Sequence, residues 1–464
     1  MIDFLKLAEA YKENIIEDLR ELIAIESIRD ETTIGANAPF GASIRQALDL
    51  MLEKARSDGF MTKDIDGYAG LIEFGQGEEI VSMLGHLDIV PIGDGWTKDP
   101  LGGEIVDGYL YGRGSGDDKG PTIAAYYALK IISELNIDLK RKIWLILGTD
   151  EESGMECMDY FVKNHPQPTI GFVPDASFPA IYGEAGILLT RLVSPNHTVI
   201  KELSAGSRPN VVISHAEAVV DGPLQEALFQ FYLKAHRLTG QCYISDKGAI
   251  YIIEGRGFHG AWPHKGVNAA YHVLNFVANA YEDEFLQKLV KLLHSPFGDG
   301  FSIAFEGAHM GSLTMNLGIV EINETMNLTL DIRYPNDTNA EHLLAQMKQA
   351  LMEVDLPIQL KLISNSDPLF VDPSSELVTI CMKAYQEFTQ DVFTPAQTMR
   401  GGTYARKLKN HIAFGPDLPN MAHPEGVGGP HEKDEAVSID TLVLATAIYA
   451  KTLFRLATDH HESS

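Results

Sequence analysis

The sequence is poor in cysteine, in long apolar runs and in positive charge. Three cysteines in 464 residues, Cys157, Cys242 and Cys381, are too few and too scattered for a disulfide framework or a thiolate metal site. No apolar run approaches the roughly 20 residues that a membrane-spanning helix needs. The N-terminus also lacks the basic start and apolar core of a signal peptide. We therefore expect a cytoplasmic protein with no membrane partner.

Positive charge is scarce throughout the chain. The 37 Lys and Arg residues stand against 64 Asp and Glu residues, which gives a formal net charge of −27. A field of that sign repels nucleic acid, so we expect no nucleic-acid partner. The 45% hydrophobic and 22% charged residues are otherwise ordinary for a folded protein, and the length predicts two or three domains.

The first part of the chain alternates predicted strands with predicted helices. Apolar runs bounded by turn residues predict strands at 71–74, 80–84, 142–147 and 169–173. Apolar residues at helical spacing predict helices at 11–23, 43–57, 122–135 and 157–164. This order is typical of an α/β fold with a mixed, mostly parallel sheet covered on both faces.

The pattern changes near residue 184. Polar, alternating strands are predicted at 216–220, 249–253 and 326–332, with helices at 224–235 and 268–280. This mixture predicts an inserted α+β lid domain with antiparallel sheet. We therefore expect a catalytic domain in two segments, 1–183 and 371–464, interrupted by the lid domain at 184–370.

A histidine and an aspartate stand where one predicted strand ends. Residues two apart on an extended chain face the same side, so His86 and Asp88 can address one object. One imidazole nitrogen can then bind a metal while the other donates to the carboxylate. A surface histidine beside an unrelated acid is the alternative for this short motif taken alone.

A glycine-rich loop carries two adjacent acids before a predicted helix. Glycines let the backbone approach closely, and Asp117 and Asp118 together can hold a hard cation. Helix capping is the alternative, since Asp near a helix N-terminus is stabilising without any ligand. Capping accounts for one acid more easily than for two.

Further carboxylates follow two of the predicted strands. Glu151 and Glu152 come after the strand that ends at residue 147, and Asp175 follows the next strand. The carboxyl ends of parallel strands are where open α/β sheets bind ligands, although an acidic run is also common in a solvated loop. His431 adds a second imidazole far along the chain. Imidazoles and carboxylates without thiolates favour zinc, manganese or cobalt, and the number of donors suits two ions.

One motif in the lid segment matches the sequence pattern of a dinucleotide-binding site. Residues 255–260 match the dinucleotide-binding pattern G-x-G-x-x-G and follow a predicted strand. That site needs a helix that starts at the glycines. Here Pro263 and Gly266 precede the predicted helix, so we interpret the match as false.

The order of the motifs resembles the M20 family of dinuclear metallopeptidases, most closely its PepV-type bacterial dipeptidases. The resemblance covers nearly the whole chain and rests on the segments 85–91, 95–97, 117–120 and 151–152. It implies a zinc-peptidase-like catalytic domain with an inserted lid. It also implies a dipeptidase that acts on small peptides with a free C-terminal carboxylate.

The resemblance implies two divalent metal ions per chain, zinc with manganese or cobalt as alternatives. His86 and Asp175 would bind one ion, and Glu152 and His431 the other. Asp117, the first acid of its pair, would bridge the two.

The resemblance also implies roles in catalysis. Glu151 would be the general base that activates a metal-bridging water, and Asp88 would orient the metal-ligating histidine. In the lid, His259 would stabilise the oxyanion and Arg333 would hold the substrate carboxylate. Further substrate contacts are implied for Asn210, Gly402 and Thr403.

Two features narrow the subfamily that the sequence resembles. Aspartate at position 175 accompanies peptidases, whereas many deacylases of the family carry glutamate there. The long lid resembles the doubled lid of the PepV type, which implies a monomer. Three alternatives stay open: an N-acyl amino acid deacylase of the same family, a non-catalytic metal-binding protein, and a nucleotide-dependent oxidoreductase.

Overall fold

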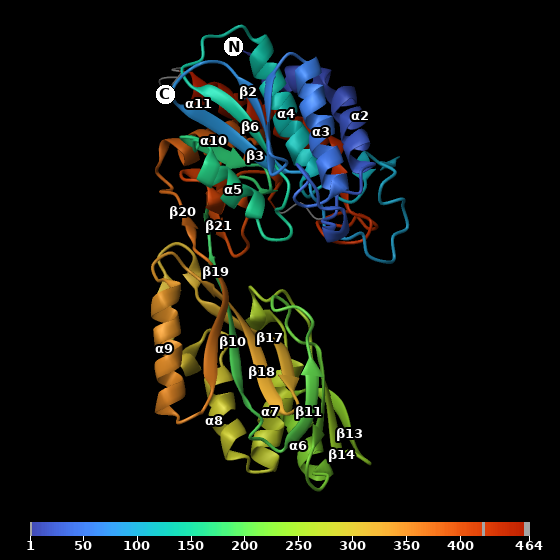
Figure 1. Ribbon diagram of the computed structural model, residues 1–464, viewed down its shortest axis with the longest axis vertical. Coiled ribbons are helices and arrows are strands. Elements are labelled where there is room, and N and C mark those ends of the chain that lie inside the picture. Colours follow the sequence, from blue (N-terminus) through green and yellow to red (C-terminus); the bar gives the residue numbers. More distant parts are fainter. Residues whose placement is uncertain (1, 420–422, 459–464) are drawn as a thin grey trace. The chain divides into compact units, whose positions relative to one another are not determined.

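The chain folds into two compact units (Figure 1). The computed structural model describes residues 2–419 and 423–458. Unit 1 comprises Met1–Tyr182, Val371–Gln397 and Gly402–Ser464, and unit 2 comprises Gly183–Phe370 and Thr398–Gly401. Unit 2 thus includes the short segment Thr398–Gly401, which lies within the predicted second catalytic segment, 371–464.

Unit 1 is built on a mixed sheet, which confirms the predicted α/β class. Its centre is parallel, in the order β6-β3-β7-β22. β2 and β1 add antiparallel strands beside β6, and β9 pairs antiparallel with β22. The strands are β1 (Met61–Ile65), β2 (Ala69–Phe74), β3 (Ile80–His86), β6 (Lys142–Gly148), β7 (Ile170–Val173), β9 (Ile181–Glu184) and β22 (His411–Ala413). β1 and β2 form a hairpin because Asp66 and Gly67 both take positive φ, the backbone of a tight hairpin turn.

Helices cover both faces of this sheet. α3, α4 and α11 pack on one face, and α5 and the short helix η4 pack on the other. Two glycines allow the close approach: a Cβ on Gly85 would lie 2.0 Å from Thr122 Oγ1 of α4, and one on Gly148 would lie 2.3 Å from the Tyr404 ring of η4. The helices of unit 1 are α1 (Phe4–Ala10), α2 (Lys12–Ile23), α3 (Ala42–Ser57), α4 (Lys119–Glu134), α5 (Glu156–Asn164), α10 (Glu376–Thr389), η4 (Tyr404–Lys407) and α11 (Ile439–Ala457). No helix among the described residues is long and apolar enough to cross a membrane.

Unit 2 contains an eight-stranded sheet in which neighbouring strands pair antiparallel, as predicted for the α+β segment. The strand order is β13-β14-β12-β11-β17-β18-β10-β19. The strands are β10 (Gly186–Pro195), β11 (Ile200–Ala205), β12 (His215–Val220), β13 (Thr239–Ser245), β14 (Gly248–Glu254), β17 (Thr314–Ile322), β18 (Thr325–Tyr334) and β19 (Gln359–Ser366). Four helices pack their apolar sides on one face: α6 (Glu226–His236), α7 (Ala269–Ala280), α8 (Glu284–Leu293) and α9 (Ala340–Glu353).

The glycines at 255–260 start no helix. The chain continues through the short helix η2 (Pro263–Lys265), and α7 begins at Ala269 with Asn268 as its N-cap. The structure therefore lacks the strand–glycine–helix junction that a dinucleotide site requires.

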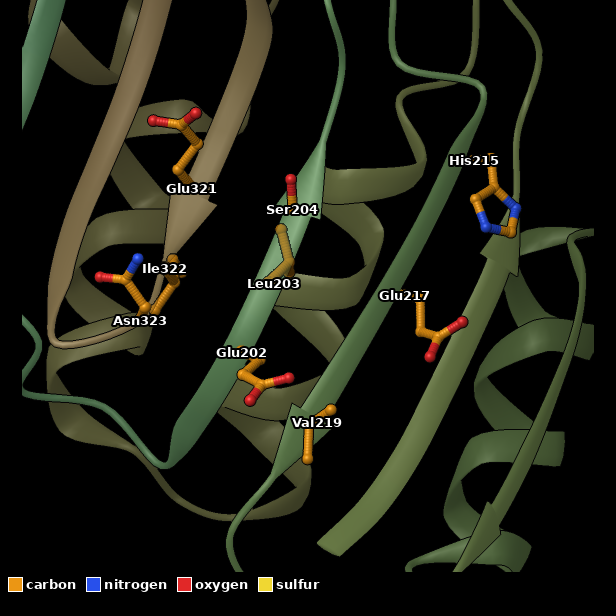
Figure 2. A pocket seen from close by; sticks show the side chains of 9 residues that line it. All are labelled: Glu202, Leu203, Ser204, His215, Glu217, Val219, Glu321, Ile322 and Asn323. Atoms are coloured by element: carbon orange, nitrogen blue, oxygen red, sulfur yellow. The ribbon is translucent and has the colours of Figure 1, made fainter. Parts of the chain in front are cut away.

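The other face of the unit 2 sheet is polar and carries an open groove of about 640 Å³ (Figure 2). Glu202, Glu217 and Glu321 project from three neighbouring strands around it, with His215 at one end. The imidazole of His215 contacts Glu254 at 2.8 Å. None of the residues predicted for the site lines this groove.

Candidate metal centre and active site

Three parallel strands bring three of the predicted metal ligands, together with the predicted base Glu151, to one edge of the unit 1 sheet. His86 is the last residue of β3, Glu151 and Glu152 follow the end of β6, and Asp175 follows the end of β7. Because β3, β6 and β7 run parallel, their carboxyl ends lie side by side. Asp117 reaches the same place from the loop just before α4.

The Asp117 carboxylate lies between two histidines. Its Oδ1 is 3.0 Å from His86 Nε2, and its Oδ2 is 3.0 Å from His431 Nε2. His431 Nε2 is also 3.0 Å from Glu152 Oε1, and His86 Nε2 is 3.9 Å from Asp175 Oδ2. The five predicted ligands therefore form two groups that share Asp117.

The carboxylates and histidines of the cluster shift one another's pKa values. Burial opposes ionisation of Asp117, but hydrogen bonds with His431 and His86 outweigh it and lower the pKa of that carboxyl. The hydrogen bonds with Asp117 and Glu152 raise the pKa of His431 to about 10. Burial and the charges of neighbouring carboxylates raise the pKa of Asp175 and of Glu151. Divalent cations bound at this cluster would balance the charge of its carboxylates.

The donor set fits divalent metal ions. Ligand atoms of His86, Glu151 and Asp175 lie within 4.8 Å of one another, as do those of His86, Asp117 and Glu152. Imidazole nitrogens and carboxylate oxygens in such a group suit zinc, manganese or cobalt.

Asp88 connects the ligand-bearing loops. Its two carboxylate oxygens accept the backbone N–H groups of Glu151 at 3.0 Å and Glu152 at 3.1 Å. His86 Nδ1 donates to the main-chain oxygen of Asp88 at 2.9 Å, and the nearer carboxylate oxygen is 3.5 Å away. The orientation of His86 thus comes from the Asp88 carbonyl, while the carboxylate fixes the acidic loop.

Asp118 makes its hydrogen bonds with the backbone of His86 and with α4. It is fully buried, and its Oδ2 accepts the backbone N–H of His86 at 3.1 Å and the hydroxyl of Thr122 at 3.0 Å. Of the two adjacent acids, Asp117 therefore belongs to the cluster, whereas Asp118 anchors the start of α4.

The sequence alone indicated no role for Glu435, which holds the backbone of the loop that carries Asp117. Its Oε1 accepts the backbone N–H groups of Gly114, Gly116 and Asp117 at 3.1, 3.0 and 3.2 Å. Its other oxygen pairs with Arg113, and both side chains are at most 2% exposed. The only indication of this role in the sequence is that Glu435 follows the predicted ligand His431 closely in the chain.

Gly402 and Thr403, the predicted substrate contacts of unit 1, lie at the start of η4. Thr403 is buried, and its Oγ1 accepts the backbone N–H of Ala405 at 3.1 Å as the N-cap of that helix. The next residue, Tyr404, accepts the backbone N–H of Asp150 at 3.1 Å and stands edge-on to the His86 ring at 6.2 Å.

The predicted residues of unit 2 lie in connected loops. Asn210 and His259 are neighbours, since the N–H of Gly260 donates to the Asn210 carbonyl at 2.7 Å and Val211 bridges to His259. His259 Nδ1 accepts the N–H of Ala261 at 3.1 Å, so the neutral ring carries its hydrogen on Nε2. Burial, and then the charge of Arg333, lower the pKa of His259 and favour that neutral form.

Arg333 is held in place by a neighbour on its own strand and by the segment Thr398–Gly401. Its Nε and Nη2 donate to the two carboxylate oxygens of Asp331 at 2.8 and 3.0 Å, and its Nη1 donates to the Arg400 carbonyl at 3.0 Å. Both members of the Asp331–Arg333 pair are buried.

Asn316 is a further residue that sequence reasoning missed. Its Nδ2 donates to the carbonyls of Pro209 at 2.8 Å and Val211 at 3.0 Å, on either side of Asn210. It therefore fixes the loop that carries Asn210 and that pairs with His259. Nothing in the sequence around Asn316 indicates this role, because it depends on the pairing of distant segments.

Comparison with known proteins agrees with this geometry. Residues 83–455 match peptidase family M20/M25/M40. The chain is 36% identical over 463 residues to "Putative dipeptidase YtjP" of Bacillus subtilis (strain 168), covering 96% of this chain and 98% of that protein. It is also 36% identical over 471 residues to "Putative dipeptidase SH1171" of Staphylococcus haemolyticus (strain JCSC1435), covering 97% and 98%.

Solved structures share the fold at low identity. The crystal structure of human carnosine dipeptidase 1 superposes with a TM-score of 0.58 at 15% identity, over 98% of each chain. Aminoacylhistidine dipeptidase from Vibrio alginolyticus gives 0.56 at 13% identity, over 95% of this chain and 96% of that one. The family match and the two relatives together show that the chain belongs to peptidase family M20/M25/M40 and is a peptide-bond hydrolase.

Proposed function

We propose that this M20 peptidase is a metal-dependent dipeptidase that uses two divalent ions per chain. The observation that carries the proposal is the position of Asp117, with one carboxylate oxygen toward each histidine. His86 and Asp175 would hold one ion and Glu152 and His431 the other, with Asp117 shared. When bound, such ions supply Lewis acidity and lower the pKa of water.

Glu151 is the proposed general base. Its backbone is held by Asp88, next to the proposed ligand Glu152, and its side chain lies in the same cluster. Its carboxylate would take the proton of the attacking water and pass it to the departing amine.

Unit 2 supplies most of the proposed substrate contacts, and unit 1 supplies Gly402 and Thr403. The Nε2–H of a neutral His259 would donate to the oxyanion that forms during attack. Arg333 has N–H groups beyond those used by Asp331 and Arg400, and it would bind the C-terminal carboxylate. Asn210, Gly402 and Thr403 would make further contacts with the peptide.

Dipeptides are the proposed substrates because the two curated relatives carry dipeptidase names and because an arginine anchor selects a free carboxylate. We also propose zinc as the ion and a monomer, working in the cytoplasm, as the active form. Manganese and cobalt are the alternative ions for the same donors.

A hydrolysis panel tests the proposal. Dipeptides, tripeptides, C-terminally amidated dipeptides and N-acetyl amino acids are supplied to the enzyme with Zn²⁺, Mn²⁺ or Co²⁺. We expect cleavage of free-acid dipeptides and little cleavage of the amidated ones. Preferred cleavage of N-acetyl amino acids would instead identify a deacylase, and equal cleavage of free and amidated dipeptides would remove Arg333 from its role.

A further inference from the structure

Unit 2 carries a second arginine beside the proposed carboxylate anchor. Arg400 belongs to the segment Thr398–Gly401, which hydrogen bonds attach to unit 2. The N–H of Ala185 donates to the Met399 carbonyl at 2.9 Å, and Arg333 Nη1 donates to the Arg400 carbonyl at 3.0 Å. The backbone of Arg400 is therefore fixed next to the Arg333 guanidinium.

The side chain of Arg400 turns to the same face of the sheet. Its Nη1 donates to Thr314 Oγ1 at 3.2 Å, and Thr314 is directly opposite Arg333 in the β17–β18 register. Side chains of directly opposite residues lie on one face, about 5 Å apart at Cβ. The Thr314 hydroxyl also donates to the Ala261 carbonyl at 3.2 Å, two residues from His259. Arg400 thus reaches the group of residues proposed to contact substrate.

The two arginines differ in how their charge is balanced. Asp331, fully buried, neutralises Arg333 through two hydrogen bonds. Arg400 is partly exposed and has no ion pair with any residue that the structure describes. Burial lowers the pKa of Arg400, and the negative charge of Glu306 opposes this more than the positive charge of Arg333 adds to it.

We propose that Arg400 is a specificity-determining residue that pairs with a second carboxylate on the substrate, so that dipeptides ending in aspartate or glutamate are preferred. The inference rests on the proposed dipeptidase function. With the α-carboxylate on Arg333, the neighbouring guanidinium of Arg400 would be available to the side chain of that same C-terminal residue. A charge-assisted hydrogen bond of this kind favours the acidic side chain over its amide by about 10- to 100-fold.

The test compares isosteric substrates. kcat/KM is measured for alanyl-glutamate, alanyl-glutamine, alanyl-aspartate and alanyl-asparagine with the wild type, Arg400→Gln and Arg400→Lys. Arg191→Gln is the matched control, because Arg191 is on the same sheet and donates to a threonine hydroxyl, Thr329 Oγ1, at 3.3 Å. Melting temperatures establish that each variant is folded.

We expect the wild type and Arg191→Gln to prefer at least one acidic dipeptide over its amide by about tenfold or more. Arg400→Gln should abolish that preference while cleaving the amides at nearly the wild-type rate, and Arg400→Lys should keep part of it. Equal use of acid and amide by the wild type would overturn the proposal. An equal loss on both substrates in Arg400→Gln would also overturn it, since Arg400 would then serve only to position Arg333.

A binding measurement separates this inference from the proposed function. Calorimetric titration of alanyl-glutamate and alanyl-glutamine into Glu151→Gln, with and without Arg400→Gln, measures binding without appreciable turnover. Tighter binding of the acid than of the amide only when Arg400 is present would support the role of Arg400 even if the wild type hydrolysed no dipeptide, a result that would contradict the dipeptidase activity. Equal binding of acid and amide with Arg400 present would contradict its role whatever the activity.

Discussion

The backbone N–H of Asp117 donates to the Oε1 of Glu435 at 3.2 Å, which ties the shared carboxylate of the cluster to a buried acid. The same oxygen accepts two further N–H groups of the glycine-rich loop, from Gly114 and Gly116. Glu435 therefore shapes the loop that presents Asp117 to both histidines.

Replacing Glu435 by glutamine should weaken both the fold and the metal site. Arg113 would lose its only carboxylate partner within the described residues while staying 2% exposed. Breaking such a buried pair costs about 3–5 kcal/mol of unfolding free energy. Urea unfolding and metal content by elemental analysis measure the two effects, with the exposed Glu425→Gln in the same loop as control. A Glu435→Gln variant as stable as the control would contradict this role.

Substitutions of the adjacent residues Glu151 and Glu152 should impair different properties, the rate of catalysis in one case and metal binding in the other. Glu151→Gln should lower kcat by about 10²-fold or more, the usual scale of general acid–base catalysis, and should retain metal. Glu152→Gln should lose metal, because Glu152 faces His431 at 3.0 Å. Kinetics and elemental analysis of both variants are the measurements. Loss of metal from Glu151→Gln as severe as from Glu152→Gln would show that the roles are exchanged.

His259→Ala should lower kcat by about 10²- to 10³-fold, as for loss of an oxyanion donor. KM should change little, because the oxyanion forms only during the reaction. His264→Ala in the neighbouring η2 helix is the control, and it should leave kcat near the wild-type value. An unchanged kcat in His259→Ala would exclude the imidazole from the chemical step.

Stability should fall below neutral pH through His411. This histidine is fully buried on β22, with Nδ1 donating to the Lys409 carbonyl at 2.7 Å and Nε2 facing the Ser82 hydroxyl at 2.6 Å. Burial lowers its pKa from 6.5 to about 4. The unfolded chain therefore takes up a proton that the folded protein excludes, so stability is full above pH 6.5 and is lost as the pH falls toward 4.

The loss from His411 amounts to about 3 kcal/mol at pH 4 and about 2 kcal/mol at pH 5. Urea unfolding at pH 7 and pH 5 measures it. His411→Gln should lose about 2 kcal/mol less than the wild type over this range, whereas the exposed His342→Gln should behave as the wild type. The same pH dependence in all three proteins would contradict the assignment.

The α/β class and the strands that carry the ligands were predictable from sequence because both depend on local patterns. Apolar runs mark β3, β6 and β7, and an acid or imidazole at the end of each is visible without knowing the fold. The antiparallel hairpin β1–β2 at the edge was not predicted, since strand direction depends on pairing across the sheet.

The supporting residues were not predictable, since their roles come from contacts between distant segments. Asn316 bonds a loop that lies about one hundred residues before it in the sequence. Arg400 bonds Thr314, and Thr314 lies opposite Arg333 only when β17 and β18 are paired. Asp117 and Asp118 look alike in sequence, yet one faces two histidines and the other holds the start of α4.

Titrating metal into the enzyme after a chelator has removed it tests the two-metal site most directly. Elemental analysis confirms the metal-free state, and hydrolysis of alanyl-alanine is followed as Zn²⁺, Mn²⁺ or Co²⁺ is added. We predict no activity without metal and a maximum at about two equivalents per chain, as for a two-metal site. Full activity of the verified metal-free enzyme would contradict a metal-dependent reaction at this site.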